Sequence, residues 1–222
     1  MTLGTLWYHK TENMTNHTNK NIKAVVFDYG GVIELEAGDM RKSIADLLGV
    51  SFDEFRNAYF KYNHLSNVEN LSWEDMIVKV VAEFNDSPEI ERKVRAMVRD
   101  ANSKREMNSE LLVLLPVLRQ LGLKIGILSN NTSDLRERLR EKNITDLVDE
   151  VVVSAEIGFQ KPHEGAFRVI FEKLHVKPEE VVFVDDAVKS LEKSAEIGYV
   201  PILFKNNEQL KADLKELGVA LP

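Results

Sequence analysis

Short apolar runs, several of them rich in valine and isoleucine, recur along the chain and predict the strands of a buried sheet. Their hydrophobic positions are continuous rather than alternating, which is typical of parallel strands covered on both faces. Polar or glycine-containing segments bound each run, and each run is short enough for a strand. The predicted strands are Ile22–Phe27, Lys124–Leu128, Glu150–Val153, Val181–Val184 and Val200–Phe204.

From residue 108 onward, the segments between these runs carry apolar residues at three- and four-residue spacing, which predicts helices. The predicted helices are Glu110–Leu121, Ser133–Lys142, His163–Leu174, Val188–Ile197 and Glu208–Leu217. Strands and helices that alternate in this way imply an α/β fold with a doubly wound parallel sheet.

Residues 36–107 show a different pattern, because their periodicity is helical throughout and predicts no strand. The predicted helices are Asp39–Leu48, Phe52–Tyr62, Trp73–Phe84 and Glu89–Lys104. Ser51 and Ser72 stand where N-caps belong, and Ser87-Pro88 is a further start signal. A segment of this length is too long for a simple crossover between two core strands. We therefore expect a helical subdomain at 36–107 inserted into a core made of 22–35 and 108–222, after a flexible tail at 1–21.

The composition narrows the functional classes. Of 222 residues, 44% are hydrophobic and 29% charged, which is enough for one core and a small accessory domain. The formal net charge of -7 argues against a nucleic-acid surface. The absence of cysteine excludes disulfides, thiolate catalysis and Cys-ligated zinc. With no signal-peptide pattern and no apolar stretch near the roughly 20 residues of a membrane span, we expect a cytoplasmic protein that does not bind membranes.

Acidic residues follow directly on two of the predicted strands. Asp28 comes after the first run, before Tyr29-Gly30-Gly31, and Asp185-Asp186 come after the run that ends at Val184. Ligands bind at the carboxyl ends of strands in open α/β sheets. Carboxylates grouped there need a compensating cation, so the pattern predicts an active site built around a divalent metal.

Four motifs at or beyond strand ends, taken in chain order, resemble those of the haloacid dehalogenase superfamily. The resemblance covers about residues 22–204 and includes the helical insertion, which is similar to the small helical cap of one branch of that superfamily. It implies aspartate-nucleophile chemistry on a Rossmann-like core. The motifs are Asp28-Tyr29-Gly30-Gly31-Val32, Ser129-Asn130-Asn131, Lys161-Pro162 and Asp185-Asp186.

The resemblance implies roles for individual residues. Asp28 would be the nucleophile that attacks a phosphoryl group to give an aspartyl-phosphate. Asp28, Asp185, Asp186 and the backbone carbonyl of Gly30 would bind Mg²⁺. Adjacent acids point to different sides, so we expect one member of the Asp185-Asp186 pair to bind the metal directly.

Further implied residues would hold the phosphate. Lys161 would neutralise charge shared by the nucleophile and the phosphate. Ser129 would donate a hydroxyl hydrogen bond, and Asn130 and Gly31 would complete the phosphate-binding site beside flexible backbone.

Position 30 departs from the family pattern. Phosphatases of this family usually carry a second acid there, which protonates the leaving group and later activates water, but this chain has Gly30. Glu34 and Glu36 follow the loop; we expect solvated loop carboxylates, with replacement of the missing acid as the alternative. Ser190, where the family more often has Asn, is a milder departure. Tyr29 is expected to pack in the core, and His163 to lie at a helix start on the surface.

The helical segment also offers candidates for the substrate cleft. His64, Tyr59 and Tyr62 would line it, or the tyrosines would simply pack in an amphipathic helix. These two interpretations stay open at the level of the sequence.

The sequence therefore predicts a Mg²⁺-dependent phosphatase acting on a small phosphorylated metabolite, with a sugar phosphate as one candidate. Two alternatives remain: a non-catalytic phosphate-binding or regulatory protein, and a metal-free haloacid dehalogenase. The expected partner is a small-molecule phosphate, and a homodimer is left open.

Overall fold

The computed structural model describes residues 21–35 and 38–222. The expected N-terminal tail lies outside these ranges except for Asn21, and so does Glu36.

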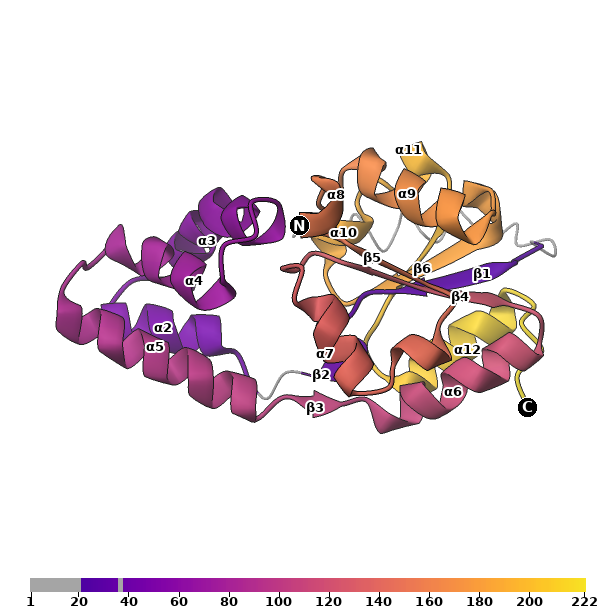
Figure 1. Cartoon of the computed structure of the whole chain (residues 1–222), viewed down its shortest axis with the longest axis horizontal. Helices are drawn as coiled ribbons and strands as arrows, with labels where there is room; N and C mark the ends of the chain where they lie inside the picture. The colour runs from indigo at the N-terminus through magenta and orange to yellow at the C-terminus, as the bar shows by residue number, and fades with distance from the viewer. Residues whose placement is uncertain (1–20, 36–37) are drawn as a thin grey trace, which may run out of the picture.

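A five-stranded parallel sheet forms the centre of the larger lobe and confirms the predicted α/β fold (Figure 1). Its strand order is β5-β4-β1-β6-β7. The apolar runs became strands because both faces of the sheet are covered, and the three central strands bury nearly every side chain. The strands are β1 (Ala24–Phe27), β4 (Lys124–Ser129), β5 (Glu150–Val153), β6 (Val181–Asp185) and β7 (Val200–Leu203).

Helices pack on both faces of this sheet, and successive residues of β1 show how the two faces are covered. Val25 and Phe27 belong to one hydrophobic cluster, with side chains of α6, α7 and α12. Ala24 and Val26 belong to the other, with side chains of α9. The helices of the core are α6 (Ser109–Gln120), α7 (Leu135–Glu141), α8 (Ser154–Ile157), α9 (Glu164–Leu174), α10 (Val188–Leu191), α11 (Ser194–Ile197) and α12 (Asn207–Glu216).

Four further helices form a second lobe, the helical insert, beside the sheet (Figure 1). Ser51, Ser72 and Ser87 are N-caps of α3, α4 and α5, as their positions predicted, and each side chain accepts a backbone N–H hydrogen bond. The apolar faces enclose a separate small core that includes Phe55, Met76 and Val94. The helices are α2 (Met40–Leu48), α3 (Phe52–Asn67), α4 (Trp73–Ala82) and α5 (Pro88–Ser103).

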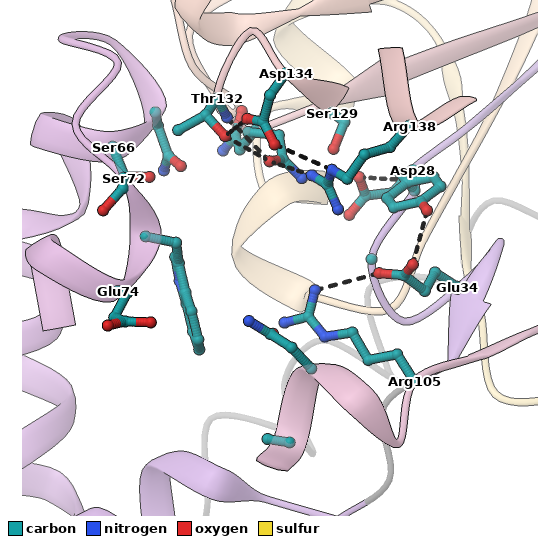
Figure 2. A pocket seen from close by; sticks show the side chains of 18 of the residues that line it. Asp28, Glu34, Ser66, Ser72, Glu74, Arg105, Ser129, Thr132, Asp134 and Arg138 are labelled. Atoms are coloured by element: carbon teal, nitrogen blue, oxygen red, sulfur yellow. Dashed lines mark hydrogen bonds and ion pairs between the residues drawn. The ribbon is translucent and has the colours of Figure 1, made fainter. Parts of the chain in front are cut away.

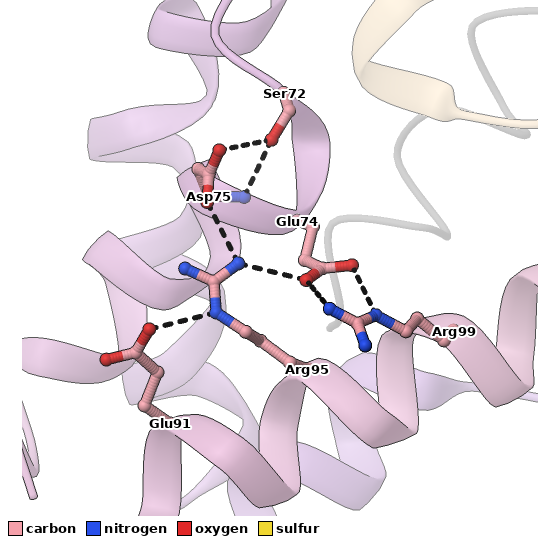
Figure 3. Close-up of polar contacts among 6 residues, drawn as sticks. All are labelled: Ser72, Glu74, Asp75, Glu91, Arg95 and Arg99. Atoms are coloured by element: carbon pink, nitrogen blue, oxygen red, sulfur yellow. Dashed lines mark hydrogen bonds and ion pairs between the residues drawn. The ribbon is translucent and has the colours of Figure 1, made fainter. Parts of the chain in front are cut away.

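Charged side chains tie α4 to α5 on the surface of the helical insert (Figure 3). Arg95 contacts Glu74, Asp75 and Glu91, each at 2.9 Å. Arg99 adds a 3.0 Å contact with Glu74.

The structure differs from the predicted elements at several places. β2 (Glu34–Leu35) and β3 (Glu106–Met107) pair as a short antiparallel ribbon where the chain enters and leaves the helical insert, although no strand was expected near residue 106. Each of these strands has only two residues, too few for an alternation of apolar and polar positions to be recognised in the sequence. α3 runs on past Tyr62 to Asn67, because Leu65 still packs on the core of the insert. The helix expected at 188–197 is two short ones, α10 and α11, and α8 was not expected.

The strand order changes direction at β1. From β1 the chain adds β4 and β5 on one side, and it then returns to add β6 and β7 on the other. Phe27 of β1 is in register with Val184 of β6, so the residues that follow them emerge side by side. This is the position at which open α/β sheets bind ligands. Among the helices of the described ranges, none combines the length and the apolar composition of a membrane span.

Candidate active site

Three carboxylates meet at the ends of β1 and β6. The backbone N–H of Asp28 donates to the carbonyl of Val184 at 2.8 Å, which fixes the end of β1 against β6. One carboxylate oxygen each from Asp28, Asp185 and Asp186 lies within 4.8 Å of the others. The strand register alone therefore assembles the acidic cluster that the sequence predicted.

Lys161 is buried among these acids. Its Nζ lies 2.9 Å from Asp28 Oδ1 and 2.6 Å from Asp185 Oδ2. Asn130 holds the backbone of Lys161 in place: its Oδ1 accepts from the Lys161 N–H at 2.7 Å, and its Nδ2 donates to the Lys161 carbonyl at 3.0 Å. Burial lowers the pKa of Lys161, but the charges of Asp185 and Asp28 more than offset it, so the pKa stands above its ordinary value and the ammonium is retained.

Asp28 is electrostatically crowded. Burial and the charge of Asp185 raise the pKa of Asp28 and Lys161 lowers it, and the net pKa is about 7. Its Oδ1 also accepts the Tyr29 N–H at 2.6 Å. One lysine cannot balance three carboxylates, and carboxylate oxygens are the ligands that Mg²⁺ prefers, so the donor set fits a divalent cation.

The two adjacent acids differ in their surroundings. Asp185 is fully buried, and both of its oxygens are engaged, Oδ2 by Lys161 and Oδ1 by the Ala187 N–H at 2.8 Å. Asp186 is exposed. Lys161 and the Ala187 N–H therefore occupy Asp185, whereas Asp186 lies on the solvent side of the cluster.

The two glycines after Tyr29 face opposite constraints. Gly31 has φ +76°, and a Cβ there would lie 2.4 Å from Asp186 Oδ2, so a side chain would displace that carboxylate. Around Gly30, no described atom lies within 4 Å of an added Cβ. The position of the missing acid is therefore open space beside Asp28.

A cavity of about 760 Å³ opens from Asp28 toward the helical insert. Figure 2 shows Asp28, Ser129 and Arg138 on its core side, and Ser66 and Ser72 of the helical insert across from them. Ser129, buried at the end of β4, and Asn130 line it, whereas Gly31 and Lys161 are not among its lining residues. Their roles in holding the phosphate stay predictions. Several further lining residues were not predicted: Arg41, Trp73, Arg105, Thr132, Asp134, Arg138 and Lys142.

Three contacts hold the helical insert over this cavity. Asn67 Nδ2 donates to Gln160 Oε1 at 2.9 Å, and the Ser133 N–H donates to Asn70 Oδ1 at 2.8 Å. Lys189 Nζ lies 3.9 Å from the ring centre of Phe60. Of the three candidates in the insert, Tyr59 lines the cavity. Tyr62 instead donates to Glu83, and His64 lies beside Glu69.

The prediction that Glu34 is a solvated loop carboxylate is wrong. Glu34 is 4% exposed and accepts the Tyr29 hydroxyl at 2.8 Å and Arg105 Nη1 at 3.2 Å. Its place on β2 turns the side chain inward, where Tyr29, itself buried as expected, anchors it. Glu34 is therefore a fixed element of the cavity wall rather than a free acid. His163 is the N-cap of α9, stacked on Phe159 with ring centres 4.7 Å apart, in accord with its expected place at a helix start.

Sequence comparison identifies relatives of the chain. Residues 25–202 match the family described as haloacid dehalogenase-like hydrolase. Phosphatase MT3486 of Mycobacterium tuberculosis is 26% identical over 216 residues, 90% of this chain and 97% of the relative. Glyceraldehyde 3-phosphate phosphatase of Methanocaldococcus jannaschii is 32% identical over 87 residues, 38% of each protein. Bifunctional epoxide hydrolase 2 of Rattus norvegicus is 27% identical over 122 residues, but the match covers 22% of that relative's length.

Solved structures share the fold. A HAD-like family hydrolase from Porphyromonas gingivalis gives a TM-score of 0.64 at 19% identity, covering 90% of this chain and 100% of the other. L-2-haloacid dehalogenase from Xanthobacter autotrophicus gives a TM-score of 0.56 at 22% identity, covering 90% of this chain and 85% of the other. Because a dehalogenase shares the fold, the fold alone does not decide the reaction.

Proposed function

The chain belongs to the haloacid dehalogenase-like hydrolase family, and from that membership we propose that it is a Mg²⁺-dependent phosphatase with Asp28 as nucleophile. The observation that carries the proposal is the cluster of Asp28, Asp185 and Asp186 around the buried ammonium of Lys161. In the proposed organisation, 22–35 and 108–222 form the catalytic core, and 36–107 form a small helical cap with Gly30 in place of the second acid.

The residues divide the chemistry among themselves. Asp28 Oδ1 is engaged by Lys161 and by the Tyr29 N–H, so we assign Oδ2 to attack phosphorus in line. Lys161 and Ser129 hold the phosphoryl oxygens, and water then hydrolyses the aspartyl-phosphate. Asp28, Asp186 and the Gly30 carbonyl would hold Mg²⁺. When bound, Mg²⁺ neutralises the carboxylates and stabilises charge on the transferring phosphoryl group.

The site lacks a clear donor of the proton that the leaving group needs, and we expect this to limit the rate of hydrolysis. Gly30 supplies none, and Glu34 is committed to Tyr29 and Arg105. A positioned general acid contributes about 10²–10⁴ in rate. We therefore expect aryl phosphates, whose leaving groups need no proton, to be hydrolysed far faster than alkyl phosphates. Equal rates would show that another residue fills the role.

Polar, uncharged side chains on the insert side of the cavity support a hydroxyl-rich substrate. Ser66, Asn67, Ser72 and Asn102 line that side together with Trp73. Hydroxyl and amide groups beside an aromatic face suit a sugar phosphate, because they offer both donors and acceptors to its hydroxyls.

Metal-free dehalogenation is the second candidate, since Asp28 could attack carbon on the same fold. The acid cluster disfavours it, because one lysine would then face three carboxylates without a further cation. A non-catalytic binding protein is disfavoured by the same cluster, since binding phosphate does not require a nucleophile.

Hydrolysis of p-nitrophenyl phosphate with Mg²⁺ and with EDTA tests the proposal. We expect turnover that is lost in EDTA and in Asp28→Asn, but kept in Asp46→Asn, a control at an exposed position of α2. If the Asp28→Asn variant kept its turnover, the assignment of Asp28 as the nucleophile would be wrong. Chloride release from 2-chloropropionate in EDTA would establish the dehalogenase instead. No turnover despite bound Mg²⁺ would establish a binding protein.

A further inference from the structure

Cationic side chains from three segments line the same cavity as Asp28. Arg41 comes from α2, Arg105 from the segment before β3, and Arg138 and Lys142 from α7 and the position just after it. The chain as a whole carries a net charge of -7, so this gathering is not the background of a basic surface. Arg41 lies 3.6 Å from Asp39, and Arg105 lies 3.2 Å from Glu34. Under the proposed function the reacting phosphate is served by Lys161, Ser129 and Mg²⁺, which leaves Arg138 and Lys142 for another part of the substrate.

Acidic side chains also line the cavity, and each has a defined place. Glu74 is bound by Arg95 and Arg99, neither of which lines the cavity. Glu34 is buried in the wall, and Asp134 lies 3.2 Å from Arg138.

Arg138 presents an incompletely used guanidinium. Its Nη2 donates to Asn131 Oδ1 at 3.1 Å, and the group lies 5.9 Å from the ring centre of Tyr29, the neighbour of Asp28. Its Nε forms an ion pair with Asp134 Oδ2 at 3.2 Å, but the Nε is buried and, among the described residues, makes no hydrogen bond. An arginine carries five N–H donors, so this side chain is held in position with donors to spare.

Lys142 stands four residues along from Arg138, which places the two on the same side of α7. Its Nζ lies 3.8 Å from Glu34 Oε1, at the outer limit of an ion pair. The oxygens of Glu34 are already bonded to Tyr29 and Arg105. The side chain of Lys142 is 41% exposed, so its ammonium can reach a group in the cavity.

We infer that Arg138 and Lys142 form a subsite for a second anionic group of the substrate, a carboxylate or a second phosphate. This rests on the proposed function and names its substrate class: small phosphates with a further anion at the far end of the carbon chain. A planar guanidinium and a mobile ammonium suit either anion.

Matched substrate pairs test the inference. Glycerol 3-phosphate and 3-phosphoglycerate differ in a hydroxymethyl group against a carboxylate. Fructose 1-phosphate and fructose 1,6-bisphosphate differ in a hydroxyl against a phosphate. We expect kcat/KM to be higher by about tenfold or more for the member that carries the second anionic group, which is the usual contribution of a charge-assisted hydrogen bond. Which pair shows the larger preference identifies the second anion.

Three variants locate the effect. Lys142→Gln and Arg138→Gln should remove the preference, mainly through KM, by lowering kcat/KM more for the member with the second anionic group than for its partner. Arg138→Lys keeps the charge and should keep part of the preference if Arg138→Gln folds poorly. Arg140→Gln is the control, because it removes the same charge from an exposed position of α7 outside the cavity.

The outcomes separate this inference from the proposed function. Asp28-dependent turnover with equal kcat/KM within both pairs would overturn the subsite and leave the phosphatase standing. A loss shared by all substrates and by Arg140→Gln would also overturn it, since that pattern indicates general attraction of anions. If no phosphate is turned over, calorimetric binding of each pair to Asp28→Asn decides: a preference that Lys142→Gln abolishes supports the subsite, and equal affinities overturn it.

Discussion

Gly30 and Gly31 are neighbours with opposite tolerance for a side chain. At Gly31 the backbone has a positive φ and approaches Asp186 so closely that only glycine fits. At Gly30 the added Cβ meets no described atom within 4 Å, and the residue is not among those with positive φ. Glycine at position 30 is therefore not imposed by packing among the described residues, and a side chain can be introduced there.

Gly30→Asp should supply the missing acid. We expect turnover of alkyl phosphates to rise by roughly 10²-fold, the low end for a positioned general acid, while aryl phosphates change little. The measurement is kcat on glycerol 3-phosphate against p-nitrophenyl phosphate in both proteins. An unchanged or lower rate on the alkyl substrate would show that protonation does not limit this enzyme.

Asp28 should make the metal-free protein less stable as pH rises. Its folded pKa of about 7 lies above the ordinary value of 3.8, so the neutral carboxyl is favoured by folding. The stabilisation is complete below the ordinary value and is lost as pH rises through about 7. In EDTA, Asp28→Asn should remove most of this decline. At pH 8 its free energy of unfolding should be higher than that of the wild type by roughly 1–4 kcal/mol. Urea unfolding of both proteins at pH 4.5, 6 and 8 measures the free energies. If the free energy of unfolding changed with pH equally in the two proteins, the expectation would be contradicted.

Residues at strand ends could be predicted from the sequence, whereas those on the cavity wall could not. Asp28 and Asp185 follow apolar runs, and a parallel sheet brings the ends of its strands together whatever the remaining details. Arg138 lies on α7 and Lys142 directly after it, and the charges of this helix look like an ordinary solvated face. Glu34 turned inward because Tyr29 and Arg105 meet it there, and Arg105 is distant in sequence, on the far side of the helical insert.

At the scale of elements, long periodic segments were predictable and short ones were not. The apolar runs and the serine caps determine strands and helix starts locally. The β2–β3 ribbon arises only because the chain enters and leaves the helical insert at the same place, which brings Glu34 opposite Met107. Tertiary pairing of this kind leaves no local pattern.

The charged network between α4 and α5 should stabilise the helical insert through Arg95. This side chain is 28% exposed and contacts three carboxylates, whereas Arg99 is 70% exposed and contacts one. Arg95→Met keeps most of the aliphatic stem, so it isolates the ionic part. We expect it to lower the stability of the insert by roughly 1 kcal/mol, because networks exceed single exposed pairs. Hydrogen exchange of amides in α4 and α5 measures the change. Arg99→Met should have a smaller effect, and an equal effect would contradict the network.

At the scale of the whole molecule, the acidic cluster links metal binding to the stability of the core. Asp28 and Asp185 stand far apart in sequence and meet only when β1 and β6 pair. The unfolded chain therefore has no equivalent site, and a cation that binds the cluster favours the folded state alone.

Mg²⁺ should accordingly raise the thermal midpoint of the protein. At a hundredfold excess over Kd the stabilisation is about 2.7 kcal/mol, which for a chain of this size corresponds to roughly 5–10 °C. Thermal unfolding with Mg²⁺ against Na⁺ at equal ionic strength separates specific binding from screening. The shift should be lost in Asp186→Asn, because that carboxylate faces the solvent side of the cluster, and kept in Asp46→Asn. If Asp186→Asn retains the full shift, the cation binds elsewhere, and the assignment of the cluster as the metal site fails even where phosphatase activity is present.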